Sequence, residues 1–284
     1  MKMTELRYND ALYPERLRAL RDAPRRLYCA GDLSLLRRRC VCVVGSRRTT
    51  AYGRRVAADI AAQLARCGIA VVSGLARGID ACAHRGALEV GGATIAVLGT
   101  GIDVPYPWVN RDLRAEILDR GLLISEYSPG TPATRYTFPQ RNRILAGISE
   151  CGAVVEAGHA SGALITAELL NAQNKDVYAV PGCINNVCSL GCNQLIRDGA
   201  IILTTIGDLL DALGLARPDT DARIAALGEE EKKIYEALRT GGEKTADELA
   251  QLTELGAARV TGLITVLEIK GLVYTSLGKV GIAK

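Results

Sequence analysis

The chain has 284 residues, of which 48% are hydrophobic, and a net charge of +4, which suits one large domain with a smaller one attached. Its start is polar and charged, and the sequence has no run of about 18 apolar residues, so neither a signal peptide nor a membrane span is expected. The nine cysteines are an odd number in a long chain without an export signal. We therefore expect a cytoplasmic protein with reduced thiols.

Charge and composition divide the chain into three predicted parts. Residues 1–40 carry ten Lys and Arg against five Asp and Glu, and they are expected to form a short, basic, helical segment that leads into the core. Residues 41–216 form the predicted core domain. The stretch 216–221, rich in Pro, Asp and Thr, is typical of a linker. Residues 217–284 follow as a smaller domain, in which nine basic minus eleven acidic residues over 219–284 give a net charge of −2.

Short apolar runs alternate with helical patterns through the core domain. Runs of this length without polar alternation are buried on both faces, which is typical of parallel strands covered by helices. The sequence therefore predicts an α/β fold with a Rossmann-like, doubly wound, mostly parallel sheet. The predicted strands are 41–44, 69–73, 94–98, 122–125, 153–155 and 177–180, with 201–203 as a last edge strand. The predicted helices are 52–67, 79–90, 110–120 and 163–174.

The C-terminal part has the pattern of a winged helix, with three helices followed by a hairpin. The helices are expected at 229–238, 245–251 and 257–270, and the hairpin strands at 272–276 and 280–283. The third helix of such domains often reads duplex DNA. Here it carries only two cations, Arg259 and Lys270, and the domain is acidic, whereas phosphate binding needs positive charge. A protein-contact or regulatory role is therefore favoured over DNA reading.

The ligand site of a doubly wound sheet lies at the carboxyl ends of its strands, so the loops there are the first candidates. Three of them combine glycine with a hydroxyl at the start of a helix, an arrangement in which unpaired amides and the helix dipole attract an anion. An arginine in a loop adds a guanidinium that grips phosphate with two hydrogen bonds. The candidate residues are Gly45, Ser46 and Arg47 in the first loop, Ser73, Gly74, Arg77 and Gly78 in the second, and Ser161 and Gly162 in the third.

Residues 135–143 are the most informative segment of the core. They follow the predicted strand 122–125, are expected to form a loop, and contain three arginines and the only Phe of the chain. Phosphates need guanidinium partners, and an unstacked base needs an aromatic face. The candidate residues are Arg135, Phe138, Arg141, Asn142 and Arg143. The alternative is that Phe138 fills the core and Arg143 caps a helix.

Seven segments, in order between residues 44 and 200, carry a resemblance that covers about residues 13–213. They read VGSRRTTAYGRRVA, VVSGLARGIDACAHRGAL, VLGTGIDVPYPWVNRDL, ISEYSPGTPATRYTFPQRNRILAGIS, EAGHASGALITAELL, VYAVPG and GCNQLIRDGA. Together they resemble the DNA-processing protein A family, also called DprA or Smf. The sequence departs from the family at Cys192, where members usually have Ser between Gly and Asn.

The resemblance implies a function without catalysis, metal or cofactor. Members of the family bind single-stranded DNA on a Rossmann-like core, form homodimers, protect incoming strands and help to load the RecA recombinase in natural transformation. The resemblance also carries DNA contacts to positions of this sequence, namely Arg47 with its Gly45–Ser46 turn, the loop 73–78, Arg135, and Phe138 with Arg141 and Arg143.

An enzymatic alternative is a nucleoside-monophosphate phosphoribohydrolase of the lysine-decarboxylase-like group, which has a related Rossmann core. In that group an acid works beside the ribose phosphate in a Pro-Gly-Gly-x-Gly-Thr-x-x-Glu loop. The corresponding stretch, residues 156–168, lacks the Pro-Gly-Gly start and ends on Glu168. The chain also lacks a P-loop motif and a Gly-x-Gly-x-x-Gly after its first strand, which argues against NTP and dinucleotide binding.

Two groups of residues have the spacing of metal ligands. Asp80 and His84 stand four apart on one predicted helix, but no third ligand is evident, and a helix-capping Asp with a hydrogen-bonded His is favoured. Cys183, Cys188 and Cys192 lie close together without a C-x-x-C pair, so ordinary thiols are favoured over zinc.

Overall fold

The computed structural model describes residues 2–216, 223–276 and 278–282. They form two compact units, Met1–Leu213 and Gly214–Lys284. The predicted linker 216–221 lies outside the described residues except for its first residue. No helix in the described parts of the chain is long and apolar enough to cross a membrane.

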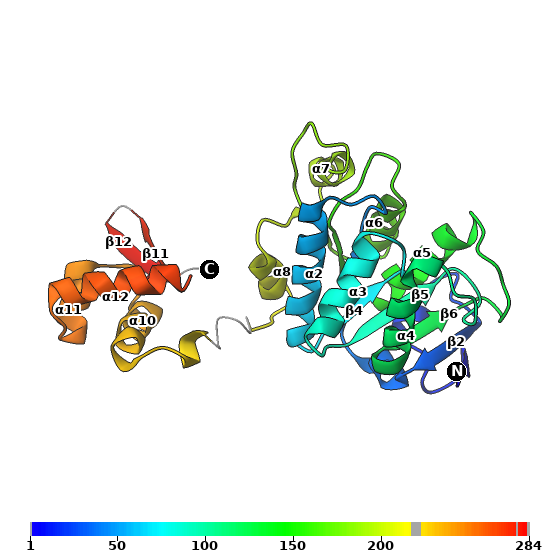
Figure 1. Ribbon diagram of the computed structural model, residues 1–284, viewed down its shortest axis with the longest axis horizontal. Coiled ribbons are helices and arrows are strands. Elements are labelled where there is room, and N and C mark those ends of the chain that lie inside the picture. Colours follow the sequence, from blue (N-terminus) through cyan, green and yellow to red (C-terminus); the bar gives the residue numbers. More distant parts are fainter. Residues whose placement is uncertain (1, 217–222, 277, 283–284) are drawn as a thin grey trace. The chain divides into compact units, whose positions relative to one another are not determined.

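The first unit is built on one large sheet (Figure 1). Among the described residues its strand order is β1-β2-β6-β5-β4-β3-β7-β8-β9. From β6 to β9 all neighbours are parallel, whereas β1 and β2 are antiparallel additions at one edge. The strands are β1 Thr4–Arg7, β2 Arg26–Gly31, β3 Cys40–Val44, β4 Ala70–Ser73, β5 Thr94–Leu98, β6 Leu122–Ser125, β7 Cys151–Val154, β8 Val177–Ala179 and β9 Ile201–Ile202.

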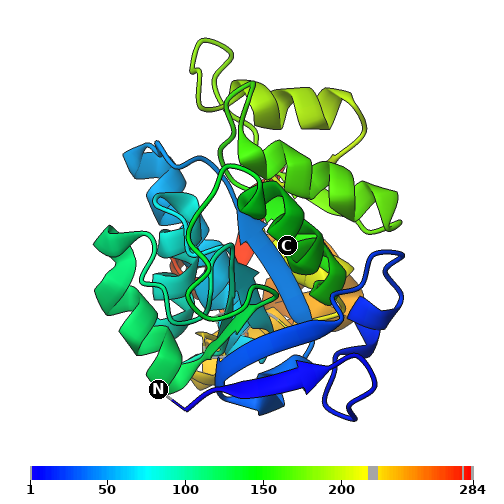
Figure 2. The same ribbon diagram turned by 90° about the vertical axis from the view of Figure 1, so that its right-hand side faces the viewer.

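Helices cover both faces of this sheet, which is the doubly wound arrangement predicted from the apolar runs. In Figure 2 the sheet lies between the blue-to-teal helices α2, α3 and α4 on one side and the green helices α5 and α6 on the other. The principal helices are α2 Ala51–Arg66, α3 Ile79–Glu89, α4 Arg111–Arg120, α5 Thr137–Ile148 and α6 Gly162–Ala172, followed by α7 Leu190–Arg197 and α8 Ile206–Ala212. The Rossmann-like α/β class is therefore confirmed.

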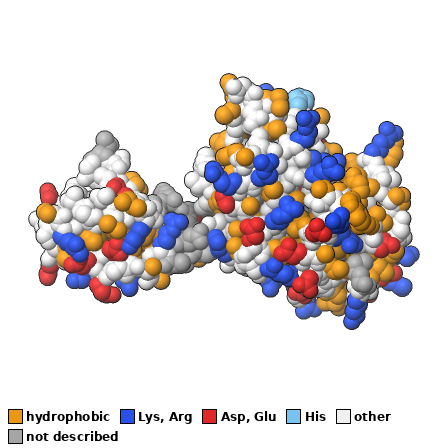
Figure 3. Space-filling view, viewed as in Figure 1, with side chains coloured by type: hydrophobic (Ala, Val, Ile, Leu, Met, Phe, Trp, Pro, Cys, Tyr) orange, Lys and Arg blue, Asp and Glu red, His pale blue; other side chains and the backbone are white. Residues whose placement is uncertain are grey.

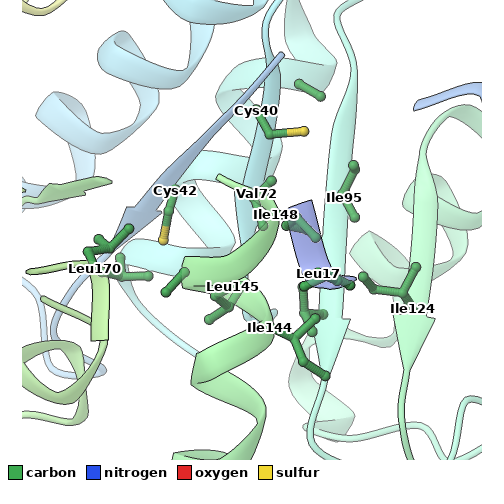
Figure 4. Packing of buried hydrophobic residues seen from close by; sticks show 14 of the residues in the cluster. Leu17, Cys40, Cys42, Val72, Ile95, Ile124, Ile144, Leu145, Ile148 and Leu170 are labelled. Carbon is green, nitrogen blue, oxygen red and sulfur yellow. The ribbon is translucent and has the colours of Figure 1, made fainter. Parts of the chain in front are cut away.

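Buried hydrophobic side chains lie on both faces of the sheet because successive strand residues point to opposite sides. On one face, Ile95 belongs to a cluster that also includes Leu145 of α5 and Leu170 of α6 (Figure 4). Its neighbour Ala96 packs on the other face with Leu88 of α3. The central strands are buried along their whole length, which explains why their sequences show no polar alternation.

The prediction that residues 1–40 form a helical segment is wrong. This segment holds a single short helix, α1 Glu15–Arg18, and a 3-10 turn at Leu33–Arg37, but its main elements are the strands β1 and β2. Strand β2 pairs antiparallel with β6 and buries four consecutive residues, 27–30. The excess of arginine masked this apolar run, because the arginines stand at and beyond the ends of the strands, as Arg26 at the start of β2 and Arg7 at the end of β1 do.

The second unit has the predicted winged-helix elements. Helices α10 Glu229–Gly241, α11 Ala246–Thr253 and α12 Ala257–Ile269 precede a hairpin of β11 Val273–Ser276 and β12 Lys279–Ile282, and β10 Lys244–Thr245 completes a small antiparallel sheet. One side of each helix joins the core, through residues such as Ile234, Leu249 and Leu267. The last residue of the predicted hairpin, Ala283, lies outside the described residues.

Candidate nucleic-acid interface

A cleft with a volume of about 1010 Å³ opens at the carboxyl ends of the central strands. It lies where the strand order reverses between β3 and β7, which is the topological switch point at which doubly wound sheets bind ligands. The described lining residues include the end of β3, the loop before α6 and one side of α5. Four arginines and a single carboxylate line it: Arg47, Arg48, Arg135, Arg141 and Asp80. On the face seen in Figure 3, basic side chains without acidic ones lie over the upper part of this unit, around the start of α2.

Helix α5 replaces most of the loop expected at 135–143. Pro139 stands in the first turn of the helix, where a missing N–H costs nothing. The helical repeat then places some side chains on the cleft side of α5 and others away from it, because residues three and four apart share a face. Phe138, Arg141, Asn142 and Leu145 line the cleft.

The same repeat takes Arg143 away from the cleft. Its guanidinium lies 2.9 Å from Asp22 Oδ2 and 2.5 Å from Glu126 Oε1, and its side chain is only 13% exposed. Arg143 therefore ties α5 to the N-terminal segment and to the residue after β6, and two carboxylates already neutralise its charge. The structure does not bring this predicted contact residue into the site.

Phe138 is half-buried at the wall of the cleft rather than in the core. The guanidinium of Arg47 lies over its ring, 5.3 Å from the centroid, and the ring of Tyr106 packs against it at 5.4 Å. A Cβ at Gly99 would come within 2.7 Å of the Phe138 ring, so glycine at that position lets the ring approach the backbone after β5. Arg47 itself is exposed. A cation and an aromatic ring thus stand together in an open cleft.

Arg141 forms the floor of the cleft and is only 4% exposed. Its guanidinium donates to the carbonyl of Gly74 at 2.9 Å and to that of Val97, and the buried carboxylate of Asp80 supports its charge. Burial lowers the pKa of Arg141 to about 10, so the group stays cationic at neutral pH, and burial raises the pKa of Asp80. Arg141 therefore links β4 and β5 from below rather than reaching out to a ligand.

The N-cap of α2, Thr50, already binds an anion, the carboxylate of Glu156. This residue, 2% exposed, accepts from Thr49 Oγ1 at 2.6 Å, Thr50 Oγ1 at 2.5 Å and the Thr50 amide at 3.0 Å. The Ser46 amide donates to the Glu156 carbonyl, and the Ser46 hydroxyl bonds to the backbone of Arg48. Contrary to the expectation, the first loop offers its exposed arginine rather than its amides.

Asp80 fills the second loop in the same way. Its carboxylate accepts from the amides of Gly74 and Ala76 at 3.1 and 3.3 Å, and Ser73 donates its hydroxyl to Val43 O at 2.7 Å. Gly78 has a φ of 81° and touches the Ser46 carbonyl, so a side chain there is excluded both by strain and by space. Arg77, the remaining candidate of this loop, is exposed, and the described lining of the cleft does not include it.

The third loop keeps its expected place at the cleft. Ser161 caps α6, accepting from the Ala163 amide at 3.3 Å, and both Ser161 and Gly162 line the cleft. Asn142 reaches over from α5 and donates to the Gly162 carbonyl at 3.3 Å. Gly162, at the first position of α6, is exposed and has open space around its Cα, so its helix terminus is accessible to an anion.

Sequence reasoning missed Tyr106 and Arg48, which also line the cleft. Tyr106 stands between two prolines in the loop after β5, and an aromatic residue in such a restrained loop at the carboxyl end of a strand was a signal that could have found it. Arg48 was visible in the sequence as the neighbour of Arg47, and nothing in the local pattern told the two apart.

Replacing Glu156 by alanine is expected to lower the free energy of unfolding by about 1–3 kcal/mol, because it leaves a buried amide and two hydroxyls without their acceptor. Glu156→Gln keeps an acceptor oxygen and is expected to cost less. Urea unfolding followed by the fluorescence of Trp108, the only Trp of the chain, measures both. Glu168→Ala, at an exposed position of α6, is the control, and equal midpoints for Glu156→Ala and the control would show that the carboxylate is dispensable.

The enzymatic and metal alternatives find little support in the geometry. Glu168 is exposed and lines a separate, smaller pocket beside α7. His84 Nδ1 lies 2.6 Å from Thr94 Oγ1, whose hydroxyl donates to Val71 O, and burial lowers the pKa of His84 to about 3. Asp80 and His84 thus have different partners. Within the described residues no group of three or more His, Cys, Asp or Glu could hold a metal.

The cysteines and the cations near α12 are the other candidate groups for metal and DNA binding. All nine thiols are free, and Cys188 and Cys192 contact different carbonyls. In α12 both cations are paired, Arg259 with Glu230 at 2.7 Å and Lys270 with Glu231 at 2.7 Å. This pairing supports the interpretation that α12 does not read DNA phosphates.

Fold and site together define a class, a Rossmann-like α/β protein with an arginine-rich, aromatic-walled cleft at its switch point. The model of the family described as DNA recombination-mediator protein A matches residues 4–214, and that of the DprA winged helix domain matches residues 218–279. The chain therefore belongs to the DprA/Smf family, as its motifs predicted.

Relatives and solved structures agree with this assignment. DNA processing protein DprA of Streptococcus pneumoniae is 43% identical over 201 residues, 71% of each chain, and Protein Smf of Escherichia coli is 42% identical over 202 residues, 71% of this chain and 54% of the relative. The chain spans 62% of a Mycobacterium tuberculosis protein, provisionally described as DprA, with which it is 44% identical over 240 residues, 82% of its own length.

Two solved structures share the fold. The X-ray structure of DprA from Streptococcus pneumoniae has a TM-score of 0.71 and 42% identity and covers 74% of both chains. DNA processing protein A from Helicobacter pylori, described with its single-stranded DNA binding mode, has a TM-score of 0.69 and 30% identity and covers 75% of this chain and 96% of its own.

Proposed function

We propose that this protein binds single-stranded DNA in the cleft at the switch point. The observation that carries the proposal is the pairing of Arg47 with Phe138, a guanidinium 5.3 Å from a half-buried aromatic ring in an open, basic cleft. A phosphate and an unstacked base are adjacent groups of one nucleotide, and this pair offers a partner to each. The Helicobacter pylori relative described with single-stranded DNA lends further support.

Some residues of the cleft contact the DNA strand directly, and others keep the loops of the cleft in position. Arg47, Arg48 and Arg135 are exposed and bind phosphates, and a base stacks on Phe138. The accessible start of α6 at Ser161–Gly162 takes a further phosphate. Arg141 and Asn142 position the loops from below. Because these contacts involve phosphates and a π-face, sequence preference is slight, and a base within a duplex cannot reach Phe138.

The wider role that we propose follows from membership of the family. The protein acts in the cytoplasm as a homodimer that protects incoming single strands and helps to load RecA recombinase in natural transformation, without catalysing a reaction. The domain limits 41–216 for DNA binding and 217–284 for the winged helix belong to the same proposal. Two cleft sites in one dimer increase avidity for long strands.

Fluorescence anisotropy with a labelled single strand and its duplex tests this function. We expect tighter binding to the single strand, and a logarithm of the association constant that falls linearly with the logarithm of salt concentration. Phe138→Ala is expected to weaken single-strand binding by about 5- to 150-fold, the loss of one stacked base at 1–3 kcal/mol. Phe138→Tyr keeps the ring and serves as the control, with little change expected. Equal affinities for single strand and duplex, or for Phe138→Ala and wild type, would rule out the proposed contact.

A further inference from the structure

The only tryptophan of the chain lies on the surface. Trp108 is 63% exposed and its neighbour Val109 is 57% exposed, although Trp is one of the residues that gain most from burial. Trp108 belongs to neither of the two described clusters of buried residues that include α5 and α4. The fold therefore gives no packing reason for an aromatic residue at this position.

Trp108 is nevertheless fixed in position. It begins a 3-10 turn, Trp108–Asn110, that leads directly into α4. Asn110, only 4% exposed, donates its side-chain amide to the carbonyls of Leu75 and Ala76 at 3.0 and 3.1 Å. The turn that carries the indole is thus tied to the loop after β4, beside the cleft.

An arginine accompanies the indole, as Arg47 accompanies Phe138. The guanidinium of Arg111 lies over the Trp108 ring at 5.1 Å from the centroid and is half exposed, with a weak contact of 3.4 Å to the exposed carboxylate of Asp112. Tyr106 is near both the Arg47–Phe138 pair and the Arg111–Trp108 pair. It is 40% exposed, lines the cleft, packs against Phe138 and stands two residues before Trp108, so their Cα atoms are at most about 7 Å apart.

We propose that Trp108 and Arg111 form a second stacking site for the same single strand, outside the cleft, reached past Tyr106. Aromatic rings at Phe138, Tyr106 and Trp108, with a guanidinium over the first and the last, match a chain in which bases and phosphates alternate. This inference rests on the proposed function, and it assigns a partner to a residue that the cleft does not include. The occupant is a nucleotide flanking the one bound at Phe138.

The intrinsic fluorescence of Trp108 tests the site without a mutation, because no other Trp contributes. The probes are oligothymidylates of about 4 and about 12 nucleotides, the range of sites that single-strand binding proteins occupy. We expect the longer strand to quench Trp108 on binding, and the shorter one, held at Phe138, to quench it much less. We expect Trp108→Ala to weaken binding of the longer strand at least about fivefold and of the shorter one hardly at all.

Matched variants separate stacking from general effects. Trp108→Phe keeps a ring and is expected to restore most of the affinity. Arg111→Ala is expected to weaken the longer strand only, whereas Arg120→Ala, at the other end of α4, is expected to change neither. If the longer strand binds in a Phe138-dependent manner without quenching Trp108, and Trp108→Ala binds it like wild type, this inference fails while the proposed function stands. If neither strand binds the wild type, both fail.

Discussion

Replacing Arg47 by glutamate is expected to weaken single-strand binding by roughly 30- to 1,000-fold at low salt, or about 2–4 kcal/mol. The change removes a charge-assisted contact to phosphate and the cation over Phe138, and it adds a negative charge where the strand lies. The salt dependence is expected to fall by about one unit of slope, because one phosphate contact and its released counterion are lost. Anisotropy titrations at two or more salt concentrations measure both effects.

The matched control lies at the opposite end of the same strand. Arg37 is exposed and precedes β3, whereas Arg47 follows it. Arg37→Glu therefore changes the net charge by the same amount, but at the amino ends of the strands, away from the cleft. We expect Arg37→Glu to alter affinity only a few-fold. Similar losses for the two variants would mean that overall charge, and not the cleft, governs binding.

Replacing Arg141 by methionine is expected to lower the free energy of unfolding by about 3–5 kcal/mol, which is a large part of the stability of a domain. The change leaves the carbonyls of Gly74 and Val97 without their donor and the buried carboxylate of Asp80 without its counter-charge. Urea unfolding of the first unit, followed by Trp108 fluorescence, gives this value. The loss comes from the connection between β4 and β5, so it requires no ligand.

Arg135→Met provides the comparison, because Arg135 lines the cleft but is exposed. Its effect on unfolding is expected to stay within about 0.5 kcal/mol, while its single-strand affinity falls. Arg141→Met is thus expected to affect mainly stability, and Arg135→Met mainly binding. An Arg141→Met protein as stable as Arg135→Met would contradict the role of Arg141 as the floor of the cleft.

The sheet was predictable because a central parallel strand is buried on both faces, and such a strand appears in the sequence as a continuous apolar run. The strands at Thr94–Leu98 and Leu122–Ser125 have the predicted limits. Helix α5 was missed because Pro139 in its first turn, with arginines on either side of that turn, forms a local pattern that a loop and a helix start share. The error mattered for the site, since only the helical repeat separates Arg141, on the cleft side, from Arg143, on the other.

Whether the loop amides are free for a ligand or already bonded within the chain could not be predicted from local sequence. Gly45–Ser46 and Ser73–Gly78 have the composition of anion sites, but groups of the chain itself already occupy them: the Ser46 amide donates to the Glu156 carbonyl, and the amides of Gly74 and Ala76 donate to the Asp80 carboxylate. Glu156 reaches the start of α2 from more than a hundred residues away, and its partner contacts follow from the fold alone. Glu156 and Asp80 were available in the sequence, yet nothing in their neighbourhoods indicated which amides they would meet.

The backbone bonds between these loops bear on how fast a strand would be captured in the proposed function. The Ser46 amide is bonded to the Glu156 carbonyl and the Ser46 carbonyl to the Ile79 amide, so the loops after β3, β4 and β7 are joined before any ligand arrives. A cleft whose walls are already set needs no loop closure, and little ordering entropy is lost when it fills. Association is then governed by electrostatic encounter with the exposed arginines, and differences in affinity between strands are expressed as residence times.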